Sequence, residues 1–507
     1  MDWIYHWGLS LAVFLPLAGM GILLLIPKSE ETGIKAVALV TSLVTFAAAI
    51  AVAAKFDYDH TNRLQMVVNK EWIPLIHSRY HIGIDGISLP LFLLSAFIVV
   101  LCIVYSWDHF PEPHNPKGFL ALILLLETGM IGTFVAQDLI LFFIFFEVVL
   151  LPMFFLIGVW GGPNREYASI KFFLFTLFGS ALMLVSFVAL FFLSKVPTFD
   201  MVTLSRLHGA GIVHGTQLLL FGGMFLGFAI KVPMFPFHTW LPDAHTEAPT
   251  VGSVILAAVL LKLGTYGFVR IALPMLPGAA ESWAPWIGLL AVIGIIYGAL
   301  GCLAQRDMKR LIAFSSVAHM GFVMLAISTL TSVGVNAAVF GMVAHGLITG
   351  MLFFLAGSVQ ERYHTREMSR LGGMLTQAPR LGWLLGFCAM ASLGLPGLAG
   401  FWGEFPSLLA SYQPDGDLST ATFRAYMVVA AVGTVLAAGY LLWMLQKVAF
   451  GRPKDEFADA HVHDVHAPEW IAWAPLLALI TVLGLFPNLL FTVTDSAGTA
   501  VTRVFGA

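Results

Sequence analysis

The chain has 507 residues, of which 59% are hydrophobic and only 11% are charged, and its mean hydropathy is +0.87. Soluble domains carry about 25% charged residues, so this composition indicates an integral membrane protein. The formal net charge of -3 argues against nucleic acid as a partner. A Walker motif is absent, and no GxGxxG follows a predicted strand, so nucleotide binding has no local support.

Apolar runs of about twenty residues recur along the chain between short polar loops. The first run, residues 7–26, is long for a signal-peptide core and has no basic segment before it, so we interpret it as a retained helix. Hydropathy predicts an all-α polytopic membrane protein with about fourteen transmembrane helices. The predicted helices are centred near Leu17, Val44, Phe97, Leu126, Val149, Val185, Gly222, Val259, Val292, Val317, Ala344, Ala389, Val432 and Leu479.

The longest polar loops span residues 56–90 and 451–469. The first contains HSRYHIGIDGISL, whose alternating pattern predicts a small hairpin. An even number of helices places both termini on one side of the membrane. The bias of lysine and arginine indicates that this side is the outer one. The loops predicted to be cytoplasmic hold Lys28, Lys35, Lys117, Arg165, Lys171, Arg306, Lys309, Arg310, Arg362, Arg366, Arg370, Arg380, Lys447, Arg452 and Lys454.

Three cysteines, Cys102, Cys302 and Cys388, lie far apart in or beside apolar runs. Their separation excludes a cysteine-ligated iron–sulfur cluster and gives no disulfide framework. The cysteines thus give no support for a bound metal cluster in this chain.

Two segments interrupt the helical pattern near the predicted middle of the membrane. In FAIKVPMFPFHTWLP, Pro233 and Pro236 remove backbone donors just after Lys231. In SLGLPGLAGFWGEF, the residues that break the helix before Glu404 are Gly394, Pro396, Gly397 and Gly400. Interrupted apolar segments at matching places in two halves indicate inverted repeats around an ion site.

We divide the chain into four parts, in which each of two repeats contains one of these breaks. We predict three N-terminal helices in residues 1–116 and a first five-helix repeat in residues 117–272. A second, inverted five-helix repeat follows in residues 282–451, and a cytoplasmic loop with a last helix fills residues 452–507. The match between the repeats is architectural, because residue identity between the halves is weak.

Five ionisable side chains lie inside apolar runs: Glu147, Lys231, Lys262, His345 and Glu404. A charge at the bilayer centre costs about 2.5–3.5 kcal/mol, so intramembrane charges are by default functional. A lysine whose proton affinity is lowered by burial and raised by a carboxylate can switch its protonation state when the carboxylate moves. The structural alternatives are a neutral Glu147 bonded to a backbone carbonyl and lysines that snorkel to the interface. We favour the functional interpretation.

Other polar residues carry weaker signals. His319 and His345 either relay protons, since histidine titrates nearest neutrality, or are hydrogen-bonded core residues. Glu127 either acts as a second functional acid or forms a bond to a neighbouring helix. Asp138 is a further secondary candidate. Two polar clusters have a metal site as an alternative interpretation, although the spacing of the first matches no standard histidine-metal pattern. We favour a surface loop that caps two helix ends for the first cluster and a solvated cytoplasmic loop for the second. The clusters are His238, Asp243, His245 and Glu247, and His461, His463, Asp464 and His466.

Three long motifs carry a family resemblance: FFIFFEVVLLPMFFLIGVWGGPNREYASIKFFLFTLFGS, KVPMFPFHTWLPDAHTEAPTVGSVILAAVLLKLGTYGFVR and DMKRLIAFSSVAHMGFV. They closely resemble the antiporter-like membrane subunits of respiratory complex I, NADH:quinone oxidoreductase, and the resemblance covers essentially the whole chain. The acid of the family's helix 5 is matched by Glu147. The lysines of its helices 7 and 8 are matched by Lys231 and Lys262, and its central histidines by His319 and His345. The L-type and N-type subunits carry lysine in broken helix 12, whereas this chain carries glutamate.

The resemblance implies a non-redox, proton-translocating subunit of a bacterial inner-membrane complex, with L-type and N-type subunits as neighbours. Two half-channels would be joined by a polar axis, and both termini would face the periplasm. Glu147 would hold Lys231 charged, and Lys231 would pass its proton toward Lys262, His345 and finally Glu404. FMN, iron–sulfur clusters and quinone would belong to other subunits. The alternatives are a subunit of a multisubunit cation/proton antiporter or of a membrane-bound hydrogenase.

Overall fold

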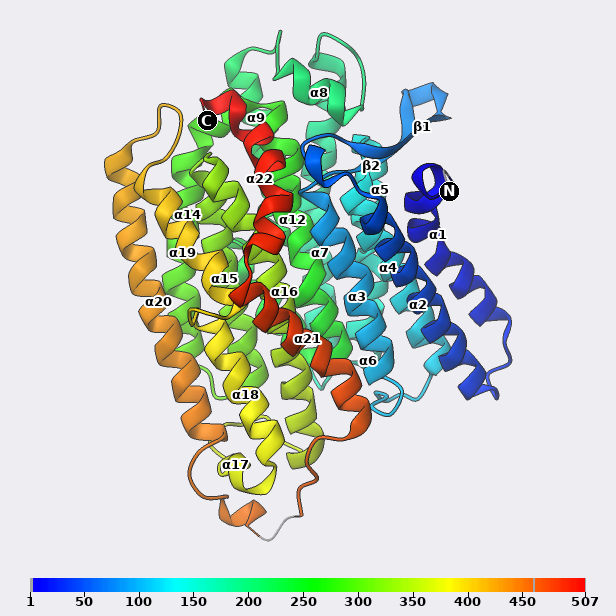
Figure 1. Cartoon of the computed structure of the whole chain (residues 1–507), viewed down its shortest axis with the longest axis vertical. Coiled ribbons are helices and arrows are strands. Elements are labelled where there is room, and N and C mark those ends of the chain that lie inside the picture. The colour runs from blue at the N-terminus through cyan, green and yellow to red at the C-terminus, as the bar shows by residue number, and fades with distance from the viewer. Residues whose placement is uncertain (1–2, 459–460, 507) are drawn as a thin grey trace.

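The computed structural model describes residues 3–458 and 461–506. Figure 1 shows a bundle of helices that run mainly along the longest axis of the molecule. Within the described residues, twelve helices are long and apolar enough to cross a membrane. Every predicted helix centre lies in a helix except Val149, which forms the junction between α5 and α6 inside one span. The expectation of about fourteen spans stays a prediction, because two further segments are interrupted.

The N-terminal part carries the predicted hairpin. Strands β1 (Gln65–Ile73) and β2 (Ser78–Ile84) pair antiparallel, which confirms it. His81 of β2 lies 2.6 Å from the carboxylate of Asp200 and so ties the hairpin to the start of α8. Burial raises the pKa of Asp200, but the bonds from His81 and Thr203 outweigh it and hold that pKa below its ordinary value. The remaining elements of this part are α1 (Trp3–Leu25), α2 (Glu31–Lys55), η1 (Tyr58–His60), η2 (Pro74–Ile76) and α3 (Ser88–Tyr105).

The first half of the bundle contains the first break. Helix α9 ends at Lys231, and the indole N–H of Trp240 donates to the freed carbonyl of Ile230 at 2.9 Å. A polar group without water must find a partner inside the protein, and the indole supplies it. The elements of this half are α4 (Pro116–Val135), α5 (Leu139–Val148), α6 (Leu150–Trp160), α7 (Arg165–Leu193), α8 (Met201–Leu207), α9 (His214–Lys231), η3 (Phe237–Thr239), α10 (Trp240–Glu247), α11 (Thr250–Ile255), η4 (Leu256–Leu260), α12 (Leu261–Gly267), η5 (Phe268–Ala272) and α13 (Leu273–Met275).

The second half contains the other predicted break, between α18 and α19. Gly394 and Gly397 have φ of +82° and +96°, which suit glycine because it has no Cβ. The indole of Trp402 donates to the carbonyl of Gly484 at 2.8 Å. The elements here are α14 (Pro277–Leu303), α15 (Met308–Ser328), α16 (Ser332–Tyr363), α17 (Met374–Gln377), α18 (Pro379–Ser392), α19 (Ala399–Tyr412), α20 (Thr420–Val448), η6 (Asp455–Phe457), α21 (Ala467–Leu485), α22 (Asn488–Thr502) and η7 (Arg503–Phe505).

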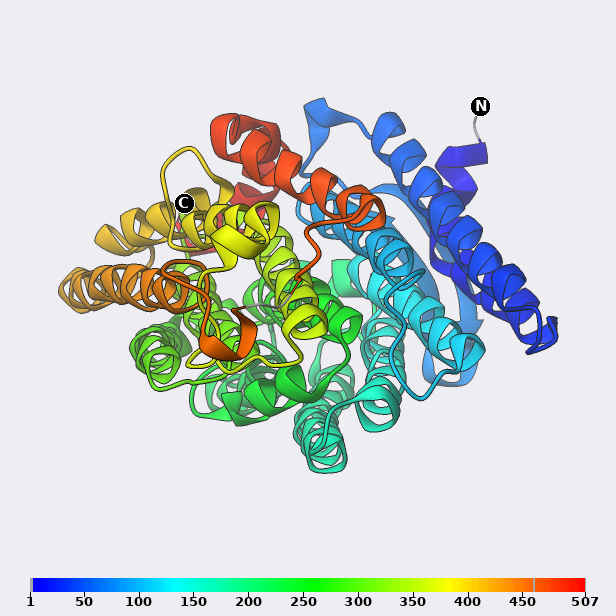
Figure 2. The same ribbon diagram turned by 90° about the horizontal axis from the view of Figure 1, so that it is seen from below.

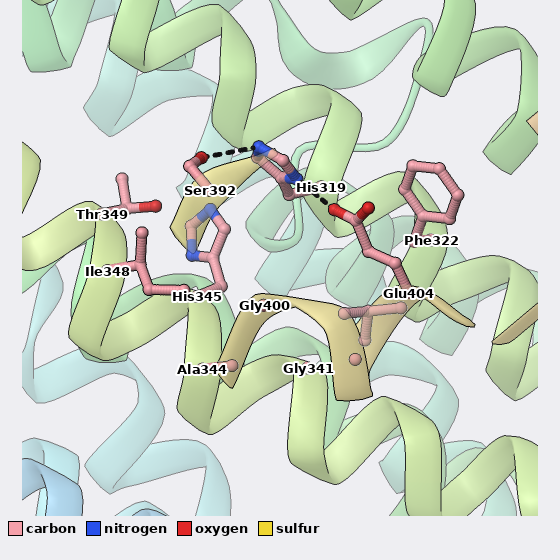
Figure 3. A pocket seen from close by; sticks show the side chains of 12 residues that line it. His319, Phe322, Gly341, Ala344, His345, Ile348, Thr349, Ser392, Gly400 and Glu404 are labelled. Atoms are coloured by element: carbon pink, nitrogen blue, oxygen red, sulfur yellow. Dashed lines mark hydrogen bonds and ion pairs between the residues drawn. The ribbon is translucent and has the colours of Figure 1, made fainter. Parts of the chain in front are cut away.

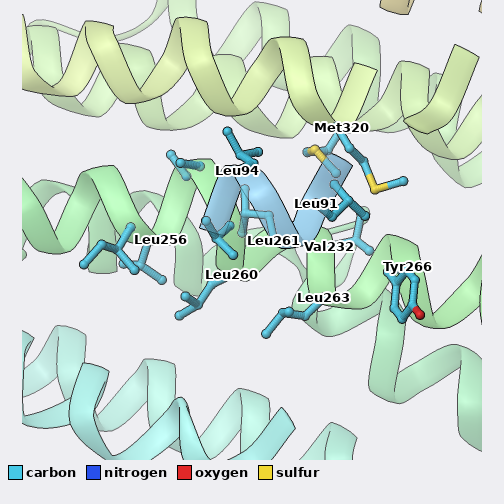
Figure 4. Packing of buried hydrophobic residues seen from close by; sticks show 14 of the residues in the cluster. Leu91, Leu94, Val232, Leu256, Leu260, Leu261, Leu263, Tyr266 and Met320 are labelled. Atoms are coloured by element: carbon cyan, nitrogen blue, oxygen red, sulfur yellow. The ribbon is translucent and has the colours of Figure 1, made fainter. Parts of the chain in front are cut away.

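The helices are sorted into an inner row and an outer layer. The most apolar stretch of α16 is entirely buried, whereas only 28% of the corresponding stretch of α2 is buried. In Figure 2, α1 and α2 lie at one edge of the molecule and α20 lies at the other. Leucines of α12, such as Leu261, pack with Leu94 of α3 and Met320 of α15 around the inner row (Figure 4). The inner row is therefore where ionisable groups are shielded from lipid.

The two ends of the bundle differ. The hairpin, α8 and both chain ends lie toward the top of Figure 1, so the termini share one end as expected. The opposite end carries α17, η6 and the loops joined by the Arg366–Asp307 ion pair. We call it the basic end, because the lysines and arginines predicted to be cytoplasmic lie in its loops and helix ends. Which end faces the cytoplasm stays a prediction.

Candidate functional site

Lys262 lies in the middle of the inner row and is fully buried. The two π-helical turns η4 and η5 flank its helix, and such widened turns leave carbonyls free for other donors. The ammonium donates to the carbonyl of Ala257 in η4 and lies 2.7 Å from Nδ1 of His345 on α16. A local widening of the helix thus aims the lysine at a histidine of the neighbouring helix.

His319 and Glu404 form a second buried pair. Nδ1 of His319 on α15 lies 2.7 Å from Oε1 of Glu404 on α19. The other ring nitrogen of His319 lies 3.1 Å from the hydroxyl of Ser392 and 3.3 Å from that of Tyr440. Figure 3 shows the bonds of His319 to Ser392 and Glu404. Both ring nitrogens of His319 therefore have polar partners.

A cavity of about 30 Å³ lies between the two pairs, and His319, His345 and Glu404 line it. The two imidazole centroids are 6.0 Å apart, too far for a direct hydrogen bond. A polar cavity of this size holds about one or two water molecules. The arrangement connects Lys262, His345, His319 and Glu404 with one short gap.

Close helix contacts build this cavity. A Cβ on Gly403, next to Glu404, would lie 2.6 Å from the Cα of Gly341 on α16. The backbones of α16 and α19 approach so closely because both residues are glycine. In the first half, a Cβ on Gly264 would lie 2.7 Å from the carbonyl oxygen of Phe228. The glycine brings the end of α9, with Lys231, against the helix that carries Lys262.

The expected pair of Glu147 and Lys231 is not an ion pair in the part of the chain that the structure describes. The carboxyl of Glu147 is half-buried beside Ser180 of α7, and it interacts with the Lys231 charge only at longer range. The ammonium of Lys231, buried to 2% exposure, lies 4.8 Å from the ring centroid of Phe146. The reason is rotational: Glu147 faces the flank of the bundle, and its neighbour Phe146 faces inward.

The two secondary candidates, Asp138 and Glu127, have different surroundings. Asp138 is the N-cap of α5 and accepts bonds from the backbone N–H groups of Ile140 and Leu141 and from Ser78 of the hairpin. That geometry is structural. Glu127 is fully buried, and neither of its carboxyl oxygens has a hydrogen-bond partner among the described residues.

The interpretation of the first polar cluster as a surface loop was wrong. Residues 240–247 form helix α10, and His245 has no exposed surface. Asp243 pairs with Lys171 at 2.7 Å, and the carboxylate of Glu247 accepts from the backbone N–H of Asn164. A polar sequence can be buried here because other helices, and not lipid, surround it. The second cluster is a mainly exposed loop, as expected, in which Asp464 caps the start of α18.

Sequence reasoning missed several residues. Asp85 and Arg270 form a buried ion pair between the hairpin segment and η5. Both were visible as charges beside apolar runs, but nothing in the sequence links them. Ser392 and Tyr440, the hydroxyl partners of His319, carried no signal. Among the described residues, no group of three or more His, Cys, Asp or Glu side chains is placed to hold a metal ion.

The fold and the site together define a polytopic helical membrane protein with two interrupted helices and a buried polar axis. A family model described as NADH:quinone oxidoreductase/Mrp antiporter, TM, matches residues 136–432. A second model, NADH-ubiquinone oxidoreductase chain 4, amino terminus, matches residues 11–133. The chain is 42% identical to NADH-quinone oxidoreductase subunit M of Rhodobacter capsulatus, an alignment that covers 98% of this chain and 96% of the relative.

Solved structures agree with these relatives. The chain superposes on a subunit of respiratory complex I from Thermus thermophilus with a TM-score of 0.88 and 29% identity, over 98% of this chain and 100% of the other. A subunit of the Mrp complex from Dietzia shares the fold, with a TM-score of 0.85 and 20% identity, over 99% and 98% of the chains. The chain belongs to the subunit M (chain 4) family of the antiporter-like membrane subunits of NADH-quinone oxidoreductase.

Proposed function

We propose that this chain is the proton-translocating membrane-arm subunit M of a bacterial NADH:quinone oxidoreductase, located in the inner membrane. The observation that carries the proposal is the run of buried titratable groups from Lys262 through His345 and His319 to Glu404. FMN, iron–sulfur clusters and quinone belong to other subunits in this proposal. L-type and N-type subunits are its neighbours, and both termini face the periplasm.

The proton steps follow from the atoms that face each other. The ammonium of Lys262 gives a proton to Nδ1 of His345, at 2.7 Å. The imidazole then releases a proton from Nε2, which lines the cavity without a partner among the described residues. Water in the cavity carries it to His319, whose ring passes it to Glu404. Each histidine accepts on one nitrogen and donates from the other.

Glu147 and Lys231 provide the control in this scheme. Lys231 is held by an aromatic ring and by the distant charge of Glu147, so small movements of Glu147 change its proton affinity. Glu147 reaches the flank of the bundle, where a neighbouring subunit would pack. A shift in that neighbour is thereby converted into a change of charge inside this chain. Release from Glu404 opposes a field worth about 2.3 kcal/mol per charge per 100 mV.

The architecture supports two half-channels. The interrupted helices α9/α10 and α18/α19 occupy matching places in residues 117–272 and 282–451, which are the two inverted five-helix repeats of this proposal. With both interrupted segments counted as spans, the chain crosses the membrane about fourteen times. Residues 1–116 and 452–507 flank the repeats.

A second candidate function is a subunit of a cation/proton antiporter, which the shared fold of the Mrp subunit favours. The deciding experiment is purification of the chain with its native partners. The proposal expects NADH:quinone activity and bound flavin to co-purify with this chain. An intact cation/proton exchanger that lacks flavin would establish the second function instead.

A further inference from the structure

His245 of α10 is a buried imidazole for which the relay above has no use. Its side chain has no exposed surface, and neither ring nitrogen has a hydrogen-bond partner among the described residues. The ring stacks on Phe353 of α16, with centroids 4.5 Å apart and planes at 15°. Buried polar groups almost always find partners, so two unpaired nitrogens on one ring require an explanation.

The position of His245 can be described along helix α16, because its ring stacks on Phe353 of that helix. Phe353 lies about two helical turns, or about 12 Å, from His345 on one side and from Glu361 on the other. Glu361 belongs to the basic end and lines a cavity of about 60 Å³ together with His109 and Thr250. His245 is therefore placed midway between the basic end and the Lys262–His345 pair.

Charged groups face His245 from both sides. Lys309 of α15, 2% exposed, donates to the carbonyl of Ala248, three residues beyond His245. The ring lies within electrostatic range of Lys309 and of Lys262. His345 lies within range of His245 in turn. Lys309 also lies within electrostatic range of Arg366, Asp307 and Glu247 at the basic end.

We propose that His245 is the proton carrier that connects Lys309, at the basic end, to the Lys262–His345 pair. This inference rests on the proposed function. A proton from the Lys309 ammonium passes to one ring nitrogen, and the other ring nitrogen releases a proton to the neutral amine of Lys262. Transfer across each gap takes water molecules or a movement of α10. The unpaired nitrogens are then the binding points of the moving proton, and Phe353 packs against the face of the ring.

The test uses the intact complex in native membranes and compares two variants that both lack the imidazole of His245. His245→Gln removes titration, and His245→Phe also does so but keeps a flat ring that stacks on Phe353. Both variants should lower coupled NADH:quinone turnover and proton pumping roughly tenfold or more, because a carrier that cannot titrate breaks the path. NADH oxidation by an artificial electron acceptor should stay within twofold, since those sites lie elsewhere.

Phe353→Leu is the matched structural control. It weakens the stack and leaves the imidazole, so it should retain at least half of the pumping rate. If His245 only packs, His245→Phe would pump normally and Phe353→Leu would be as damaging as His245→Gln. That result would overturn the inference.

Glu404→Gln, measured in parallel, separates this inference from the proposed function. If Glu404→Gln stops pumping while both His245 variants pump within twofold of the unaltered complex, the role of His245 is refuted and the relay stands. If Glu404→Gln pumps normally, the relay itself fails, and the role of His245 fails with it.

Discussion

Both interrupted helices leave backbone carbonyls that need a partner outside the helix. The ionisable residues beside the two breaks, however, have different surroundings. At the first, Lys231 points at an aromatic ring, and its carboxylate partner stays at a distance. At the second, Glu404 is bonded to His319 beside a cavity with room for water. A charge among aromatic rings can respond to a field but has no ready acceptor for its proton. A carboxyl bonded to an imidazole has one, so the first break suits control and the second suits transfer.

The largest expected effect is at the second break. Glu404→Gln keeps a hydrogen bond to His319 but cannot lose and regain a proton, so pumping in reconstituted vesicles should fall by about a hundredfold. Glu404→Asp should keep part of the activity. Glu404→Lys should be partly tolerated, because lysine can also release a proton when buried. If Glu404→Gln pumps well and Glu404→Lys does not pump, Glu404 only stabilises the interrupted segment.

The first break should respond as a single unit. Lys231→Ala or Glu147→Gln should each lower pumping roughly tenfold, and the double variant should be little worse, because the two charges act through each other. Lys231→Arg should also fail, since arginine keeps its proton. Complex assembly, followed by co-purification of partner subunits, is the control. Fully additive losses would separate the two residues and would remove the contrast drawn between the breaks.

Both breaks depend on a glycine where two backbones meet, so adding one methyl group should damage each. Gly403→Ala and Gly264→Ala should each lower the stability of the complex by about 1–3 kcal/mol, because backbone cannot move aside as a side chain does. Gly439→Ala on α20 is the matched control, since its Cβ would meet no atom within 4 Å. Thermal unfolding of the purified complex measures all three. Equal melting temperatures would show that the approach is loose.

The smallest expected difference lies between the two tryptophans. Trp240→Phe leaves the carbonyl of Ile230 without its donor in a fully buried site and should cost about 1–3 kcal/mol. Trp402 is only half-buried, so water or lipid headgroups can replace its bond to Gly484, and Trp402→Phe should cost less. Hydrogen exchange of the amides around each break measures the local effect. A larger loss at Trp402 would contradict the expectation that water or lipid headgroups replace its hydrogen bond.

Much of this protein was open to prediction from local pattern. Residues such as Lys262 stand out because a charge in an apolar run is visible without knowledge of the fold. Proline and glycine mark Lys231 and Glu404 as lying beside breaks, because these residues act on their own backbone. The hairpin followed from alternation alone.

Two features could not be predicted from the sequence, because they depend on which residues become neighbours in the folded protein. Glu147 was expected to hold Lys231 charged, and the two charges do lie within electrostatic range of each other. The contact of Lys231 with the ring of Phe146 could not be foreseen. His245 was assigned to a surface loop because its segment is polar. Hydropathy measures the preference for lipid, however, and α10 is surrounded by protein.

The sequence by itself determined the class of protein, the helices, both breaks and the ionisable residues, because each depends on chemistry within a few residues of chain. Only the tertiary structure decided which of these residues meet. The bonds of Lys262 to His345 and of His319 to Glu404 join residues about 80 positions apart. They depend on how each helix is rotated, on the π turns beside Lys262 and on glycines that let backbones touch. Packing of the whole bundle sets these features, and no short segment encodes them.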